Sequence, residues 1–259
     1  MKRFLALTLA MLMLLCTLAA CSDKEAGEGG NIAPVETSEM VYKAEGTHND
    51  QYYYEYIEGD EVAIVGFAAS HELHAITVPA TIDERPVTKI ADSAFKNATN
   101  VSEVTLPETV REIGVAAFAK CTALKRINIP AVVTYIGEAA FTETAIVDVT
   151  LPDTLETLGA AAFFGCKSLV TVRIPASITK IPAQLLMDCT ALSTVVWGNV
   201  SEVGDYAFFG CTVLHTITFP TTLTAVGNYA FADCKALTVP ALADTVQVGT
   251  NAFYNTLAG

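Results

Sequence analysis

The cysteines are the residues of this chain whose side chains could bind a metal or form disulfides. Five of the seven cysteines occupy one position of a repeated motif: Cys121, Cys166, Cys189, Cys211 and Cys234. No two of them have the Cys-x-x-Cys spacing of a zinc site, and no histidine follows at ligand distance. Copies in neighbouring repeats could approach disulfide distance, but parallel side chains rarely reach the required dihedral angle. We therefore expect buried thiols that act as small core residues, and no metal or other cofactor.

The histidines and carboxylates do not form a convincing metal-binding motif either. His71 and His74 have the spacing of a ligand pair, with one acidic residue between them, but no further ligand follows. The acidic turn at 58–61 lacks the regularly spaced oxygen ligands of a calcium loop. The chain also contains neither the Gly-x-Ser-x-Gly motif of a hydrolase nor a Gly-rich phosphate loop. We therefore expect a protein that is not an enzyme.

The first residues have the organisation of an export signal. Lys2 and Arg3 precede an uncharged apolar stretch at 4–20, which is short for a membrane span. The sequence Leu18-Ala19-Ala20-Cys21 resembles the bacterial lipobox. The resemblance implies that 1–20 is a lipoprotein signal peptide and that acyl chains on Cys21 anchor the protein to the bacterial cell membrane, facing outward. The alternative is an ordinary secretory signal with a chance cysteine.

The net charge of the chain excludes one class of partner, and the composition of its N-terminal part predicts a tether. The chain has 15 basic and 28 acidic residues, a formal net charge of −13. Such a surface repels phosphate backbones and anionic headgroups, so we expect no nucleic-acid partner. Residues 21–50 are rich in Gly, Glu, Ser and Thr and have no apolar periodicity, which predicts a flexible tether.

An apolar motif repeats every 22 or 23 residues over much of the chain. A short β-like run such as 104–106 precedes a proline, and a glycine follows seven residues later. The Ala-Phe pair comes next, and Cys and Leu then follow at steps of three, as in Phe118, Cys121 and Leu124. Alternation along the strand directs every second side chain inward. Pro107 ends its strand because proline has no N–H to donate.

One such coil cannot bury its own apolar side, so the coils must stack. The pattern predicts an α/β solenoid with one short parallel strand and one short helical or 3₁₀ turn per coil. We expect 76–259 to form this repeat domain. The tyrosine-rich segment 51–75 is expected to be a β-hairpin, turning at 58–60, that caps the N-terminal end of the first coil.

Two stretches carry a family resemblance: "VTLPDTLETLGAAAFFGCKSLVTV" and "ITFPTTLTAVGNYAFADCKAL". They resemble the BspA-type leucine-rich repeat, and the resemblance extends over about 76–253. It implies a bacterial surface lipoprotein. Members of this family are typically linked to adhesion, to matrix proteins or to other cells.

The outward strand positions form the candidate binding face, because a solenoid presents them as one continuous surface. The candidate residues are Thr105, Arg126, Asn128, Asp148, Thr150, Thr171, Arg173, Thr194, Val196, Thr216 and Thr218. The alternative is that threonine simply suits exposed strands. Trp197, the single tryptophan, falls at an inward position and is expected in the core rather than as a ligand platform.

Together these features predict a surface-exposed, lipid-anchored protein that mediates adhesion or protein–protein interaction through the solenoid sheet. The expected partner is a host or microbial surface protein, with membrane contact through the lipid anchor alone. The alternative is a carbohydrate-binding or envelope-structural protein.

Overall fold

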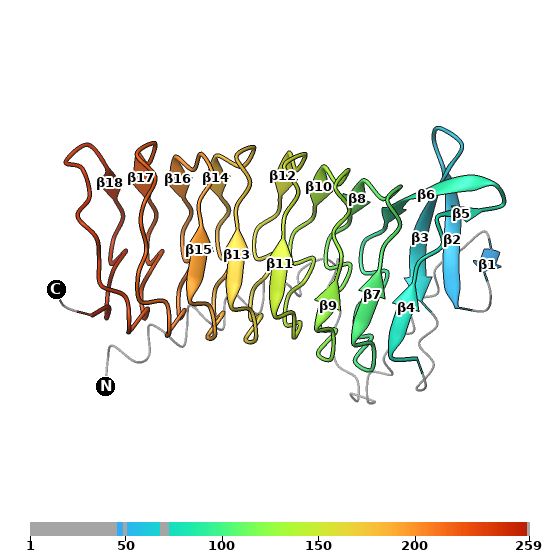
Figure 1. The fold of residues 1–259 in the computed structure, drawn as a ribbon, viewed down its shortest axis with the longest axis horizontal. Helices are drawn as coiled ribbons and strands as arrows, with labels where there is room; N and C mark the ends of the chain where they lie inside the picture. Colours follow the sequence, from blue (N-terminus) through green and yellow to red (C-terminus); the bar gives the residue numbers. More distant parts are fainter. Residues whose placement is uncertain (1–45, 49–50, 68–72, 258–259) are drawn as a thin grey trace, which may run out of the picture. The chain divides into compact units, whose positions relative to one another are not determined.

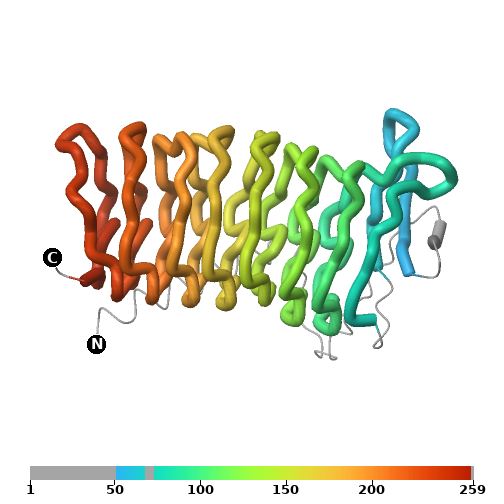
Figure 2. The backbone as a smooth tube through the Cα atoms, in the orientation of Figure 1, coloured from blue at the N-terminus to red at the C-terminus, as the bar shows by residue number. Residues whose placement is uncertain are grey.

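The computed structural model describes residues 46–48, 51–67 and 73–257. The signal segment 1–20, Cys21, most of the tether and His71 lie outside the described residues. Lipidation of Cys21 and the tether therefore stay predictions. The described residues build a series of short coils stacked in a row, each a narrow loop of chain beside the next (Figures 1 and 2).

The first face of the solenoid carries the strands expected from the Val-Thr-Leu pattern. All pair in parallel, and paired residues lie one repeat apart, as Val104 with Ile127 and Val149 with Val172. One sheet contains β4 (Ala75–Thr77), β7 (Glu103–Thr105) and β9 (Arg126–Ile127), and a second contains β11 (Asp148–Thr150), β13 (Thr171–Arg173) and β15 (Thr194–Val196). The parallel solenoid is thus confirmed.

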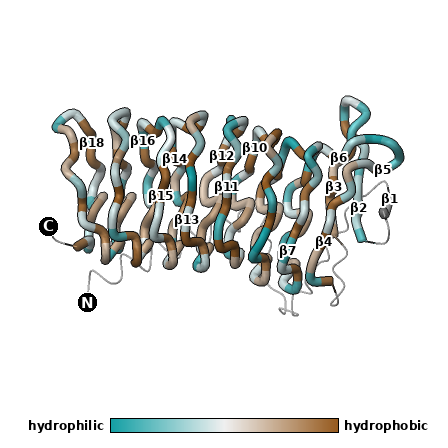
Figure 3. Tube along the Cα trace, viewed as in Figure 1, coloured by the Kyte–Doolittle hydropathy of each residue, from teal (hydrophilic) through white to brown (hydrophobic). Residues whose placement is uncertain are grey.

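A second face holds another strand in nearly every coil, which the repeat pattern did not predict. These strands are β6 (Arg85–Ile90), β8 (Glu112–Ile113), β10 (Tyr135–Ile136), β12 (Thr157–Leu158), β14 (Lys180–Ile181), β16 (Glu202–Val203), β17 (Ala225–Val226) and β18 (Gln247–Val248). They pair in parallel from β6 to β12 and again from β14 to β18. In all of them except β18, the last residue of the strand is buried, as Ile113 is. Hydrophobic and hydrophilic residues accordingly alternate along the coils (Figure 3).

The third face is where a helical turn was expected after each Ala-Phe pair, but the described residues contain no helix. Single turns occur instead, separated by residues with left-handed backbones such as Ala116 (φ 52°) and Lys120 (φ 61°). The reason is that amides on this face bond across coils. The Phe118 N–H donates to the Ala140 carbonyl at 2.8 Å, so it is not available to a helix.

Antiparallel strands lie before the first coil. β2 (Tyr52–Ile57) pairs with β1 (Gly46–His48) and with β3 (Glu61–Phe67), and β3 pairs in parallel with β6. β5 (Thr81–Ile82) also joins β6. Tyr52 is buried and its hydroxyl donates to the Thr77 carbonyl at 2.8 Å, which ties β2 to the first coil. The capping function expected of 51–75 remains a prediction.

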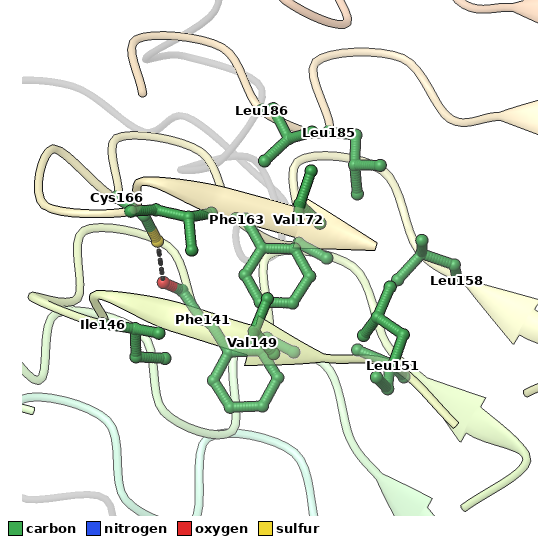
Figure 4. Packing of buried hydrophobic residues seen from close by; sticks show 14 of the residues in the cluster. Phe141, Ile146, Val149, Leu151, Leu158, Phe163, Cys166, Val172, Leu185 and Leu186 are labelled. Atoms are coloured by element: carbon green, nitrogen blue, oxygen red, sulfur yellow. Dashed lines mark hydrogen bonds between the residues drawn. The ribbon is translucent and has the colours of Figure 1, made fainter. Parts of the chain in front are cut away.

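The core is a file of phenylalanine rings. Phe118 and Phe141 stack at 5.5 Å between ring centroids, and Phe141 and Phe163 at 5.3 Å, with the rings nearly parallel. Figure 4 shows Leu185 and Leu186 continuing this core beyond Phe163. The predicted single apolar interior is confirmed, since the buried residues of all coils form one cluster.

Candidate binding surface on the first face

The side chains expected on the candidate face are where the alternation predicted them. All are exposed except Thr171, which is half-buried. They fall into two columns that follow the strand register. The first column contains Glu103, Arg126, Asp148, Thr171, Thr194 and Thr216, and the second contains Thr105, Asn128, Thr150, Arg173, Val196 and Thr218. Thr216 and Thr218 belong to no strand, so the face continues there without a ladder.

The first interruption of the face lies between β9 and β11. Asn128, which follows β9, turns its side chain away from this interruption and toward the coil of β7. Its Oδ1 accepts from the Leu106 amide at 2.7 Å and its Nδ2 donates to the Leu106 carbonyl at 2.8 Å. The Asn128 side-chain amide thus makes the two hydrogen bonds to Leu106 that the main chain of a paired strand would make. Asn128 is a positioning residue for this face rather than a free binding group, and its spacing in the sequence carries no signal of that role.

A shallow groove of about 290 Å³ lies over β7 and β9 and reaches Asp148 of β11. Within it, the Arg126 guanidinium donates to Glu103 at 2.7 Å, which lowers the pKa of the Glu103 carboxyl and raises that of Arg126. The Arg126 side chain is nevertheless 74% exposed. Because exposed ion pairs contribute little to stability, Arg126 can exchange Glu103 for a carboxylate of a partner. Arg173 is held similarly by Asp153, at 3.1 Å.

The second interruption follows β15, where a larger groove of about 560 Å³ opens. Trp197 lies in its wall and packs on Phe208 and Phe219, with ring centroids 5.6 and 6.1 Å away. It is partly buried against the core, as its inward position predicted. Its indole Nε1 is buried without a hydrogen-bond partner among the described residues.

Comparison with known proteins identifies the repeat. Residues 64–193 and 134–258 match the family model of the BspA type leucine rich repeat region, in six copies. The chain belongs to the BspA-type leucine-rich repeat family. This confirms the resemblance on which the sequence analysis relied. No curated protein matches the chain.

Solved structures share this BspA-type fold. A leucine-rich repeat protein from Bacteroides ovatus is 24% identical, with 81% of this chain and 68% of that one covered and a TM-score of 0.62. The T. pallidum leucine-rich repeat protein TpLRR is 24% identical, covering 74% and 90%, with a TM-score of 0.54. One from Eubacterium ventriosum is 23% identical, covering 71% and 59%, with a TM-score of 0.58. These likenesses show the fold alone.

The cysteine column of the BspA-type repeat is buried and structural. Each Sγ donates to a main-chain carbonyl of the preceding coil, as Cys166 does to Phe141 at 3.1 Å (Figure 4). Burial raises the pKa of Cys121 to about 12 and of Cys166 to about 11. These two thiols are therefore protonated and inaccessible at neutral pH, unlike a catalytic nucleophile.

The acidic residues of the turn at 58–61 make structural contacts within the protein. Asp60 pairs with Arg85 at 2.6 Å, and Glu61 accepts from Thr88 at 2.7 Å and pairs with Arg111. These contacts engage Asp60 and Glu61 of the acidic turn at 58–61. Among residues 51–67 and 73–257, no three His, Cys, Asp or Glu side chains gather as metal ligands. The same part of the chain has no helix of the length and apolarity that crossing a bilayer requires.

Proposed function

We propose that this BspA-type repeat protein is displayed outside a bacterial cell by lipid on Cys21 and binds another protein through the first face. The observation that carries the proposal is the pair of exposed, in-register side-chain columns on that face. A stacked solenoid holds such columns rigidly, so little conformational entropy is lost when a partner binds. Leucine-rich repeats commonly serve as interaction scaffolds, which supports the same role.

The chemistry of the face suits a protein partner. Threonine hydroxyls donate and accept hydrogen bonds, and Arg126 and Arg173 offer planar donors to carboxylates. A carbohydrate-binding role finds less support, because Phe208 and Phe219 cover part of the Trp197 ring that would stack on a sugar. The groups on the face therefore favour protein recognition.

The binding half of the proposal is tested by retention of partners on the immobilised, purified protein. A panel of matrix proteins, including fibronectin, and of host and bacterial surface extracts is passed over wild type and the double variant Arg126→Ala/Arg173→Ala. We expect at least one protein to be retained by wild type and at least tenfold less by the variant. Lys96→Ala, which removes an exposed charge from the third face, serves as control. Equal retention by wild type and double variant, or none across the panel, contradicts the proposal.

The anchoring half is tested separately. Mass spectrometry of the mature protein from a bacterial membrane fraction should find Cys21 as the first residue, carrying acyl groups. Replacement of Cys21 by Ser should release the protein from the membrane. An unmodified Cys21 in membrane-bound protein would overturn this half alone.

A further inference from the structure

The coil that carries β15 and the coil that follows it separate on the first face only. Among the described residues, no main-chain hydrogen bond joins 193–198 to 215–220. The same two coils stay paired on the second face, where Glu202 is in register with Ala225. On the third face the same two coils also stay paired, since the Phe208 amide donates to the Ala230 carbonyl at 2.8 Å. The opening is therefore local to the first face.

Aromatic side chains distinguish this opening from the interruption between β9 and β11. The inward position at the end of each first-face strand holds an aliphatic residue in most coils, such as Leu106, Leu151 and Ile174. In the two coils that separate it holds Trp197 and Phe219. Their rings meet across the two coils with centroids 6.1 Å apart, and two such large side chains at adjacent inward positions favour a wider spacing of the main chains there.

The groove exposes unpaired main-chain groups along one strand edge. Thr194 and Val196 face β13, because the Thr194 amide donates to the Val170 carbonyl and the Val196 carbonyl accepts from Ile174. Since neighbouring residues of a strand direct their main-chain groups to opposite sides, the N–H and C=O of Val195 face the groove. The partnerless indole N–H of Trp197 belongs to the same wall.

We propose that this groove binds an extended segment of a partner protein as an added β-strand. A free strand edge recognises the main chain of an extended peptide, and the apolar wall of Val195, Trp197 and Phe219 accepts alternate apolar side chains. The other lining residues are Ser193, Val196, His215, Pro220 and three threonines, and none is a carboxylate or a Lys or Arg. The inference rests on the proposed function and names the form of partner that the face recognises.

Charge defines the flanks of the segment. The chain carries a net charge of −13, so it attracts a basic segment and repels an acidic one over longer distances. Because no carboxylate, lysine or arginine lines the groove itself, it suits an uncharged centre of the segment. The predicted segment thus has alternating apolar and hydroxyl residues between lysines or arginines.

The test uses the full chain and a blocked peptide, acetyl-Lys-Thr-Val-Thr-Leu-Lys-amide, whose centre repeats the Val-Thr-Leu of strand positions 104–106. Trp197 is the only tryptophan of the chain, so its emission reports on the groove directly. We expect a saturable change in emission. Peptides with alternate amides N-methylated keep their side chains but lose main-chain donors, and at least one of the two alternate sets should bind tenfold or more weakly. No saturable change, or equal binding of all three peptides, overturns the proposal.

A variant pair separates this inference from the proposed function. Trp197→Leu/Phe219→Leu should close the ladder and weaken binding of a fluorescein-labelled peptide at least tenfold by anisotropy. Arg126 lies outside the groove. The variant Arg126→Ala should therefore bind the peptide with unchanged affinity but retain less of the partner protein in the retention experiment. Unchanged peptide affinity in a double variant with native circular dichroism overturns strand addition; if that variant misfolds, the N-methyl comparison on wild type decides. Partner retention that depends on Arg126 without peptide binding leaves the proposed function standing alone.

Discussion

Single residues in the cysteine column act as hydrogen-bond donors to the preceding coil. Cys189 Sγ donates to the Phe163 carbonyl of the preceding coil at 3.1 Å, whereas Thr144, at the equivalent position of its coil, donates its hydroxyl to the Phe141 carbonyl of the same coil at 3.0 Å. We therefore predict that Cys189→Thr satisfies its hydroxyl by donating to the Leu186 carbonyl of its own coil, and that Cys189→Val, isosteric with the threonine variant, has no donor. The valine variant should be less stable than the threonine variant by about 1 kcal/mol, measured by urea unfolding. Equal stabilities would mean that the thiol matters only for its volume.

The partly buried carboxyl of Asp188 predicts a pH-dependent effect on stability. Its pKa is raised chiefly by burial, and also by Asp233, while Lys167 opposes the shift. A carboxyl with a raised pKa in the folded state binds more protons there than in the unfolded chain, so its charged form destabilises the fold as pH rises through that pKa. Asp188→Asn should raise the melting temperature at pH 7 and change it little at pH 3. A variant that melts lower than wild type at pH 7 would contradict this account.

The turns between strands depend on two kinds of glycine. An added Cβ at Gly137 would lie 2.6 Å from the amide nitrogen of Val115 in the preceding coil, whereas Gly165 has a left-handed backbone (φ 67°) and meets the flexible Glu143 side chain. Gly137→Ala should cost about 1–3 kcal/mol through overpacking. Gly165→Asn should be nearly neutral, because Asn97 adopts the same conformation (φ 65°) at the matching position. Denaturant unfolding of both variants tests the difference; similar losses would contradict the crowding argument for Gly137.

The elements differ in how far the sequence could predict them. The first-face strands were predictable because three alternating residues before a proline, as in 104–106, repeat in register. The two-residue strands of the second face, such as β8, are too short to produce a periodic signal. The helical turn was not found because left-handed residues such as Lys120 are set by hydrogen bonds to the next coil, which no local pattern encodes. The Asn128 contacts and the opening beside Trp197 likewise depend on distances between coils.

At the scale of the whole molecule, stability should decline from the middle of the stack toward its C-terminal end, because each coil contacts only its neighbours. Phe141 is buried between stacked rings on both sides, whereas partly buried Phe253 stacks on Phe231 from one side. Phe141→Ala should cost about 3–5 kcal/mol, and Phe253→Ala clearly less. Hydrogen exchange should increase over several coils in the first variant and only around β18 in the second. A loss of equal size and extent in both would mean that the stack unfolds as one cooperative block, in which position along the row does not matter.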